Sequence, residues 1–345
     1  MKSMTIFLMM VLTACLLGCS SDENTMAPAP GANVPNTDAP SLPTEVESSP
    51  SVEGEAVTLR YRFEEGQRMD YIMNQEVASD IVSLNQQTET NIDIYFHVTV
   101  DAVEADGTAT VTQTNDRVKF KVKGPGGTIV YDSADGEESD HPQWQGGLRV
   151  VIMAMQHAEC TFRVTPGGIV SDVKPTDELV ARIKEDPAIA SVFTESQLKA
   201  NAKAVFHPLP GGSLKPGETW EYKDESDDVL PGIKMEYVIT KTYEGSEERD
   251  GRQVARIGET EEITTEFDQN SPLKYVPDDE ANVGLEYYDL ALGWKIESHD
   301  TSVAAVTQSL GGNTIELETS TKVAIYLQPA AEEEPVPESN SNEGR

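Results

Sequence analysis

Long segments in which apolar and polar residues alternate constrain the fold of this chain more than any other feature. One apolar series occupies every second position from residue 92 to 102, and another runs over residues 315–327. Residues 118–122 repeat the pattern, with lysines between the apolar residues. Because successive side chains of a strand point to opposite faces, each segment predicts a half-buried β-strand. The members of the first series are Ile92, Ile94, Phe96, Val98, Val100 and Ala102.

Turn sequences separate these strands and predict that neighbouring strands pair antiparallel. Asp106-Gly107 follows the first strand and favours a two-residue hairpin, because both residues tolerate positive φ. The Gly-Pro-Gly-Gly run at 124–127 predicts a second hairpin. The Thr-Pro-Gly-Gly run at 165–168 joins strands 160–164 and 169–173. Gly311-Gly312 lies between a strand around residues 302–310 and the last long strand.

Three short helices are expected in the middle of the chain. Residues 147–157 carry apolar side chains at helical spacing, at Leu148, Val151, Ile152 and Met155. Residues 177–184 form the second. The third runs from 194 to about 206, where Thr194 and Gln197 match a capping box.

The two ends of this region resemble each other. Residues 66–71 (GQRMDY) match residues 217–222 (GETWEY), and a strand, an Asp-Gly turn and a strand pair follow each in the same order. We therefore expect a mainly β (α+β) fold, in which two similar antiparallel halves, about 56–175 and 212–329, form a curved sheet or an open barrel. The central helices, within 176–206, would join the halves. Two separate small domains are the alternative.

The first residues have the pattern of an export signal. After Lys2, an apolar run of about 14 residues ends at Leu17, which is shorter than the roughly 20 residues that span a bilayer. Gly18-Cys19 follows, and polar residues begin at Ser20. Leu16 to Cys19 resembles the lipobox of bacterial lipoproteins. The resemblance implies a signal peptide at 1–18, cleavage between Gly18 and Cys19, a diacylglycerol group on the Cys19 sulfur and a fatty acyl group such as palmitate on its amine.

Two other interpretations of this segment stay open. Cys15 also fits the lipobox pattern, although cleavage there would leave apolar Leu16 and Leu17 at the new end. The second interpretation is an ordinary cleaved signal peptide, in which neither cysteine is modified with lipid. If Cys19 is modified, the protein is anchored in the cell envelope and faces the periplasm or the exterior. By resemblance to known sorting rules, Ser20 after the cysteine favours the outer membrane.

Both flanks of the β-rich region are predicted to be disordered. Residues 19–55 are rich in Pro, Ser, Ala and Thr, and residues 330–345 form an acidic tail. As a flexible coil the first segment would separate its ends by roughly 30–35 Å. A linker of this length would hold the domain away from the lipid surface.

Charge and cysteine content exclude several partners and bonds. The net charge of −34 argues against nucleic acid as a partner and against attraction to anionic lipids, so the lipid anchor would provide membrane attachment. Cys15 leaves with the signal and Cys19 is acylated, so only Cys160 remains and the mature chain has no intrachain disulfide. Cys160 alternates with Phe162 and Val164, which predicts a buried strand cysteine.

No metal or cofactor is expected. The chain has no metalloprotease, nucleophile-elbow, P-loop or dinucleotide motif. His157, Cys160 and His141 could approach one another, but they do not make a four-ligand zinc set. Three acidic clusters were candidates for calcium, and solvated loops are the simpler interpretation. They contain Asp132, Asp135, Glu137, Glu138 and Asp140; Asp224, Glu225, Asp227 and Asp228; and Asp278, Asp279 and Glu280.

Aromatic residues near turns and strand ends are expected to pack in the core or at sheet edges. A contact with a ligand at the mouth of a curved sheet is the alternative for them. They are Trp144, Trp220, Trp294, Tyr287 and Tyr288.

Several segments also resemble an uncharacterised family of bacterial envelope lipoproteins. They are residues 63–67 with Tyr71, residues 162–170, and residues 208–220, and the resemblance extends over about residues 57–327. These motifs are turns and strand edges. The family has no assigned activity, so the resemblance implies no catalytic residue.

The expected function is that of a non-enzymatic module which contacts another envelope component, a protein or a glycan. An anchor, a flexible linker and the lack of a catalytic motif support it. Two alternatives stay open. The first is a carrier that holds an apolar ligand or lipid in the curved sheet. The second is a hydrolase that uses a pair of carboxylates, whose separation the sequence does not give.

Overall fold

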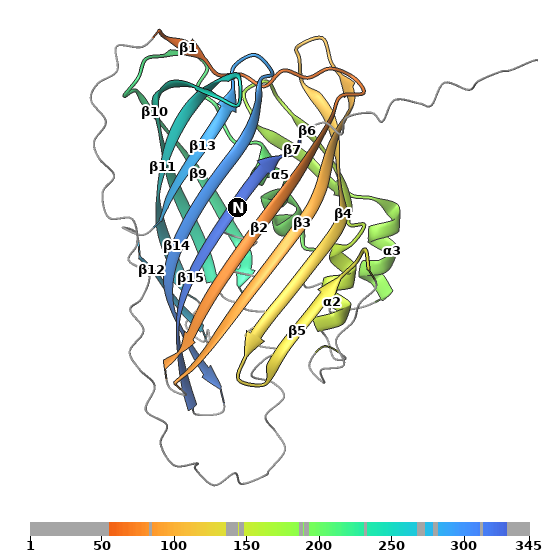
Figure 1. Ribbon diagram of the computed structural model, residues 1–345, viewed down its shortest axis with the longest axis vertical. Helices are drawn as coiled ribbons and strands as arrows, with labels where there is room; N and C mark the ends of the chain where they lie inside the picture. Colours follow the sequence, from red (N-terminus) through yellow and green to blue (C-terminus); the bar gives the residue numbers. More distant parts are fainter. Residues whose placement is uncertain are drawn as a thin grey trace, which may run out of the picture.

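The computed structural model describes residues 55–82, 85–135, 144, 148–185, 189, 193–230, 233–267, 273–278, 282–310 and 313–329. Strands dominate this part of the chain (Figure 1), and the alternating segments lie within the long strands β3, β4 and β15. The helices are α2 (Arg149–Met155), α3 (Asp177–Glu185) and α5 (Glu195–Val205). The strands are β1 (Val57–Thr58), β2 (Arg68–Ile81), β3 (Gln86–Val103), β4 (Ala109–Gly124), β5 (Gly127–Asp132), β6 (Glu159–Val164), β7 (Val170–Pro175), β8 (Ser213–Leu214), β9 (Thr219–Leu230), β10 (Ile233–Arg249), β11 (Arg252–Phe267), β12 (Leu273–Pro277), β13 (Val283–Asp289), β14 (Trp294–Leu310) and β15 (Asn313–Leu327).

Thirteen strands form one antiparallel sheet. Its order is β7-β6-β4-β3-β2-β15-β14-β13-β11-β10-β9, with β5 beside β4 and β12 beside β14. The sheet is curved, and β9, β10 and β11 lie behind the wall that β14, β15 and β2 form (Figure 1). In the described residues β7 and β9 remain edges that do not pair with each other, so the sheet is open. The predicted mainly β fold with a curved antiparallel sheet is confirmed.

The sheet consists of two similar halves, as the sequence repeat predicts. The first half has the order β2-β3-β4-β6-β7 and the second has β9-β10-β11-β13-β14. The small strands β1 and β8, which precede the two halves, pair with each other. Equivalent strands therefore have equivalent neighbours in both halves.

Hydrogen bonds at the start of each half repeat in detail. Gly66 N–H donates to Val100 O at 2.8 Å, and Gly217 N–H donates to Tyr243 O at 2.7 Å. Both glycines have positive φ, at 80° and 88°. A β-bulge follows Val100 in β3 and Tyr243 in β10. The short sequence match thus reflects the same turn, built twice.

The two junctions between the halves differ. On one side β15 pairs with both β14 and β2, which continues the sheet from the second half into the first. On the other side α5 packs against β7 and β9. Helix α5 therefore lies at the opening between β7 and β9, whereas strand β15 fills the other junction between the halves.

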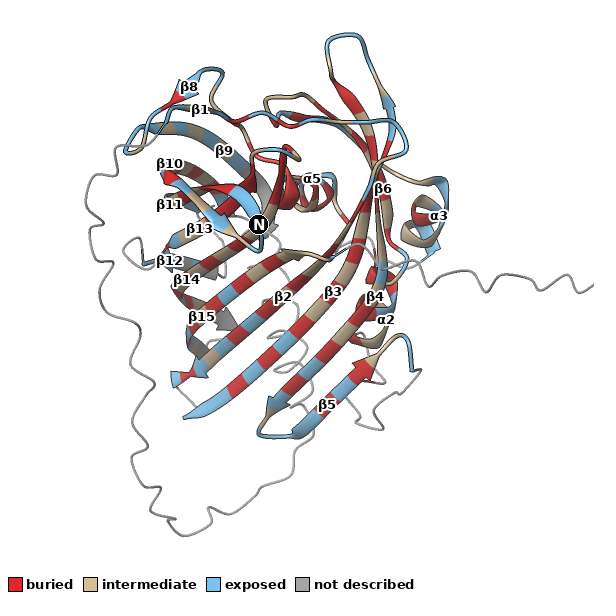
Figure 2. Cartoon of the chain, turned by 45° about the horizontal axis from the view of Figure 1, so that its top comes forward, coloured by how far each residue is buried: buried red, intermediate tan, exposed pale blue. Residues whose placement is uncertain are grey.

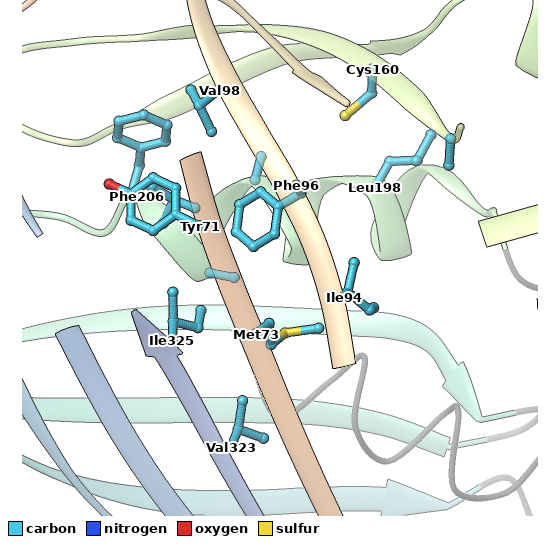
Figure 3. Packing of buried hydrophobic residues seen from close by; sticks show 14 of the residues in the cluster. Tyr71, Met73, Ile94, Phe96, Val98, Cys160, Leu198, Phe206, Val323 and Ile325 are labelled. Carbon is cyan, nitrogen blue, oxygen red and sulfur yellow. The ribbon is translucent and has the colours of Figure 1, made fainter. Parts of the chain in front are cut away.

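Alternation along the strands separates an inner from an outer face (Figure 2). The largest apolar cluster, here the upper cluster, includes the inner side chains near the helices. Figure 3 shows Tyr71 and Met73 of β2, Ile325 of β15 and Leu198 of α5 within it. A second, lower cluster lies on the inner faces of β2, β10, β11, β14 and β15. Its buried members are Val77, Ile81, Met235, Tyr237, Ile239, Ile263, Ala304, Val306 and Leu317.

Three local predictions need correction. Ala102 is exposed, because the bulge after Val100 shifts the alternation by one residue. Asp106-Gly107 is not a two-residue hairpin: only Gly107 has positive φ, and the last pair of the ladder is Val103 with Ala109. At the equivalent turn, Asp250 and Gly251 both have positive φ and do form a two-residue hairpin.

The third correction concerns helix ends. Helix α2 covers only part of the predicted segment 147–157, although its predicted apolar positions are buried. Thr194 caps α5 by accepting a bond from Gln197 N–H at 3.2 Å. The Thr194 side chain therefore forms the cap predicted from the sequence, while Gln197 Nε2 is buried without a hydrogen-bond partner among the described residues.

Candidate functional site

A belt of polar residues crosses the inner face between the two apolar clusters. Strand register places it: Lys241 is opposite Glu259, Glu259 is opposite Gly284, and Gly284 is opposite Asp300. The same row continues through Val323 to Gln75. We call this group the polar belt; its members are Gln75, Lys241, Glu259, Glu261, Glu286, Lys295, Ser298 and Asp300, all of which are buried or nearly so.

Buried ion pairs form the centre of the belt. Lys241 Nζ lies 2.5 Å from Glu286 Oε2 and 2.8 Å from Glu259 Oε2, and Lys295 Nζ lies 3.4 Å from Glu286 Oε1. The Lys241 side chain is 1% exposed and that of Glu286 is 5% exposed. Charges this deep are tolerated only because they are paired.

The pKa values of Lys241 and Glu286 keep both groups charged. Burial alone would lower the pKa of Lys241, but Glu259 and Glu286 outweigh it and hold that pKa well above its usual value. Burial alone would raise the pKa of Glu286, but Lys241 and Lys295 outweigh it and the pKa is lowered. Both groups are therefore ionised at neutral pH.

The belt also holds the end of α5. Lys295 Nζ donates a short hydrogen bond to Ala204 O, and Tyr61 Oη donates to Val205 O at 3.3 Å. These carbonyls belong to the last turn of α5, where no intrahelical donor remains for them. A cation at a helix C-terminus is also favoured by the helix dipole. The ion pairs thus fix the helix at the opening of the sheet.

His207 lies beside the belt without a hydrogen bond from its ring. Its Nε2 is 3.1 Å from Glu286 Oε2, but neither ring nitrogen has a partner in hydrogen-bond geometry among the described residues. Burial, together with Lys241 and Lys295, lowers the pKa of His207 well below its usual value. The ring is therefore neutral at physiological pH.

Gly284 brings two carboxylates of the belt together. A β-carbon at this position would lie 2.5 Å from Asp300 Oδ1 and 3.5 Å from Glu259 Cδ. A side chain at residue 284 would therefore collide with Asp300 Oδ1, so the glycine makes room for that carboxylate beside Glu259.

The predicted anchor lies outside the described residues. Cys19, Gly18 and the alternative Cys15 all precede residue 55, as do the signal peptide and most of the linker. Lipid modification at Cys19 therefore stays a prediction.

Cys160 is a buried strand cysteine, as predicted, and is free. Burial raises the pKa of its thiol to about 12, so the reactive thiolate is scarce at neutral pH. We expect the native protein at pH 8 to react with a thiol reagent far more slowly than the same protein in denaturant, by about a thousandfold or more. Rapid labelling of the native protein would contradict a buried Cys160.

The residues considered as metal ligands do not converge. His157 is exposed, Cys160 is buried and His141 lies outside the described residues. A group that the sequence analysis missed is Asp70, His97 and Asp116, whose ligand atoms lie within 4.8 Å of one another. His97 Nδ1 lies 2.7 Å from Asp116 Oδ2, and Arg68 Nη2 lies 2.7 Å from Asp70 Oδ1. Arg68 already supplies the positive charge there.

The second acidic cluster, residues 224–228, lies within strand β9 and not in a loop, so that part of the prediction is wrong. Acidic residues of the first two clusters have basic partners. Asp132 binds Arg117 through both oxygens, at 2.8 and 2.6 Å, and this contact lowers the pKa of Asp132. Asp224 pairs with Lys203 of α5. Glu137, Glu138, Asp140, Asp279 and Glu280 lie outside the described residues.

The predicted aromatic residues pack as expected. Trp144, Trp294, Tyr287 and Tyr288 are buried, and Trp220 Nε1 donates to Pro208 O at 3.1 Å. Trp294 Nε1 donates to Arg62 O at 2.9 Å. These contacts are structural.

The polar belt itself was not anticipated, although part of its signal is visible in the sequence. Lys241 continues the alternating series Met235, Tyr237 and Ile239, so it occupies a position of the buried face. Its partner Glu286 is 45 residues away along the chain. Alternation could have indicated a buried lysine, but it could not have named the acid.

The fold and the belt define a class of protein: an open, curved antiparallel sheet with ionised groups on its inner face. A sequence model described as a family of unknown function (DUF6263) matches residues 106–276, which is just under half of the 345-residue chain. No curated protein matches the chain.

Solved structures resemble the chain distantly. A lipovitellin structure concerned with lipid–protein interactions is 12% identical with a TM-score of 0.39; the match covers 78% of this chain and 26% of that one, so this chain spans about a quarter of lipovitellin. A Bacteroides fragilis protein described as exported, with a YmcC-like fold, is 10% identical with a TM-score of 0.23, covering 78% and 97%.

A Vibrio parahaemolyticus domain described as that of an outer membrane lipoprotein-sorting protein is 14% identical. Its TM-score is 0.15, and the match covers 76% of this chain and 87% of that one. All three TM-scores are too low to support an argument about function. In the described residues, no helix has both the length and the hydropathy needed to cross a membrane.

Proposed function

We propose that this protein is a lipid-anchored binding module of the bacterial cell envelope, which holds an apolar ligand on the inner face of its curved sheet. The lower cluster is the observation that carries the proposal. Among the described helices, α2 packs against β4, α3 against β7, and α5 against β7 and β9. The lower cluster therefore lies on strands other than those that these helices mainly contact, and its aliphatic, aromatic and methionine side chains suit an alkyl chain.

The proposal involves no chemical step. A glycosidase-type acid needs a carboxyl group whose pKa is raised so that it can donate a proton at neutral pH. The pKa of Glu286 is lowered, and Lys241 contacts both Glu286 and Glu259. These contacts favour binding and structural roles over proton transfer.

Ala304 and Ala305 offer a matched test of the ligand site. Ala304 is buried on the inner face within the lower cluster, and its neighbour Ala305 is exposed on the outer face. We expect organic extracts of the purified full-length protein to contain an apolar compound at close to one equivalent. Ala304→Asp should lower that amount by about tenfold or more, because a buried carboxylate opposes an alkyl chain, while Ala305→Asp should leave it unchanged.

Circular dichroism would show whether the Ala304→Asp protein keeps its β structure. If it does not, Ala304→Phe, which fills the site without a charge, takes its place. Extracts of the wild-type protein without any apolar compound, combined with no uptake of added lipid, would overturn the proposed function.

The anchor has its own test. We expect Cys19→Ser to abolish metabolic labelling with an alkyne analogue of palmitate and to prevent removal of the signal peptide, because the thiol that accepts the lipid is gone. Cys15→Ser should leave both unchanged. The opposite result, loss with Cys15→Ser alone, would move the anchor to Cys15.

A further inference from the structure

The charged groups of the polar belt already interact within the protein. Lys241 pairs with Glu259 and Glu286, while Lys295 contacts Glu286 and the last turn of α5. The remaining two acids of the belt also interact with other groups of the protein. The charges of the belt therefore do not call for a charged ligand.

Two neutral groups of the belt, in contrast, lack partners. Gln75 of β2 is 1% exposed, and neither the nitrogen nor the oxygen of its amide has a hydrogen-bond partner in the described part of the chain. Ser298 of β14 is fully buried, and its hydroxyl has no such partner there either. Buried polar groups without hydrogen bonds cost free energy, so both side chains favour a ligand that supplies donors and acceptors.

Strand register places Gln75 and Ser298 on the same wall of the sheet. Gln75 is opposite Val323 of β15, and Val323 is opposite Asp300 of β14. Ser298 precedes Asp300 by two residues, so its side chain points to the same face. With strands about 4.8 Å apart and a rise of about 3.3 Å per residue, the α-carbons of Gln75 and Ser298 are roughly 12 Å apart. A head group of several atoms can therefore contact both side chains.

Buried hydroxyl groups continue from these residues toward the lower cluster. In the next inward-facing row, Val77 of the lower cluster is opposite Thr90 of β3 and Thr321 of β15. Thr321 is in turn opposite Ser302 of β14. Each of these three hydroxyl residues is less than one tenth exposed. The wall thus changes from amide and hydroxyl groups to the aliphatic side chains of the lower cluster, which is the order of polarity along a neutral lipid.

We infer that the inner face binds a neutral lipid whose head group carries hydroxyl groups, such as a monoacylglycerol. The head group lies at Gln75 and Ser298, and the alkyl chain lies on the lower cluster. The inference rests on the proposed function and adds the chemistry of the head group. A hydroxyl group both donates and accepts, so it suits the nitrogen as well as the oxygen of the Gln75 amide, whereas an ammonium group only donates and a carboxylate only accepts.

Three matched probes test this inference. Each has the same twelve-carbon acyl chain with a photoreactive diazirine on the same carbon, and the three end in a glyceryl ester, a methyl ester or a free carboxylate. Full-length protein in detergent is labelled with each, and mass spectrometry maps the modified peptides. We expect the glyceryl ester to label β2, β14 and β15 about tenfold more than the methyl ester does, because its hydroxyl groups add hydrogen bonds, and the carboxylate to label them least.

Two variants and one control identify the residues. Gln75→Leu and Ser298→Ala should each reduce the preference for the glyceryl ester over the methyl ester to about threefold or less, while labelling by the methyl ester persists. Gln87→Leu, the same change at an exposed position of β3, should keep the full preference.

Thermal unfolding of the delipidated protein separates a ligand contact from a structural role. Leucine replaces an amide without a protein partner by an apolar side chain of similar size, so Gln75→Leu should not lower the unfolding temperature. A marked decrease would show that the amide bonds to the protein itself and would contradict the inference.

The labelling outcomes distinguish the two claims. If the methyl ester labels the inner strands as strongly as the glyceryl ester, if the carboxylate labels them most, or if Gln75→Leu keeps the full preference, the head-group inference is wrong and the proposed function stands. If no probe labels these strands, the proposed function fails and the head-group inference fails with it.

Discussion

We expect Lys241→Met to lower the free energy of unfolding by about 3–5 kcal/mol, because it leaves buried Glu286 and Glu259 without the cation between them. Methionine keeps the length and apolar character of the side chain, so the loss reports the charge. Chemical denaturation of the full-length protein measures it. Lys223→Met is the control: Lys223 pairs with Glu236 on the exposed face, and its removal should change stability by no more than about 0.5 kcal/mol.

The effect of Lys241→Met should depend on pH in one direction. The pKa of Glu286 is lower in the folded protein than its usual value, so its contribution to stability is present at neutral pH and is lost as pH falls through the folded pKa. The difference between wild type and Lys241→Met should therefore be largest near neutral pH and should shrink as pH falls, because a protonated Glu286 no longer needs the cation. A difference that is constant, or that grows on acidification, would contradict the ion-pair account.

Gly168→Ala should be about as damaging, with a loss of about 3 kcal/mol or more. Gly168 has a φ of 79°, which costs a residue with a β-carbon about 1–2 kcal/mol. That β-carbon would also lie 1.9 Å from His207 O, so the backbone after α5 must move. Overpacking of this kind costs about 1–3 kcal/mol.

Two other glycines, Gly293 and Gly211, serve as controls for the Gly168→Ala substitution. Gly293 occupies the equivalent hairpin of the second half and has a φ of 74°, but an added β-carbon would lie no closer than 2.7 Å to Arg62 Cγ and 3.0 Å to Arg62 N, against 1.9 Å at Gly168. Gly293→Ala should therefore cost less than Gly168→Ala. Gly211 has nothing within 4 Å, and Gly211→Ala should change stability by no more than about 0.5 kcal/mol. Equal losses at all three positions would show that the tight contact with the backbone of His207 is not the cause.

Local patterns were sufficient to predict many of the strands and the two halves, but not β2 or β11, and part of β9 was predicted to be an acidic loop. Alternation identifies a strand because it depends on the two-residue period of the backbone alone. The glycines at 66 and 217 mark the repeat because both adopt positive φ in the same turn. The predicted two-residue hairpin at Asp106-Gly107 was wrong. An Asp-Gly sequence permits positive φ at both residues, but it does not require it, and only Gly107 adopts it.

Long-range contacts could not be predicted in the same way. The pairing of β15 with β2 joins residues more than 200 positions apart, and no local pattern specifies it. The bulge after Val100, which exposes Ala102, depends on pairing with β4. The belt depends on the same register, since Lys241, Glu259 and Asp300 meet only when four strands are aligned.

An experimental density map of the mature protein, isolated from membranes without exposure to organic solvent, tests the central claim most directly. We expect elongated density along the lower cluster, in contact with Met235 and Ile263 on one wall and Val306 and Leu317 on the other. A map in which these side chains pack directly against one another, with no density between the walls, would contradict it.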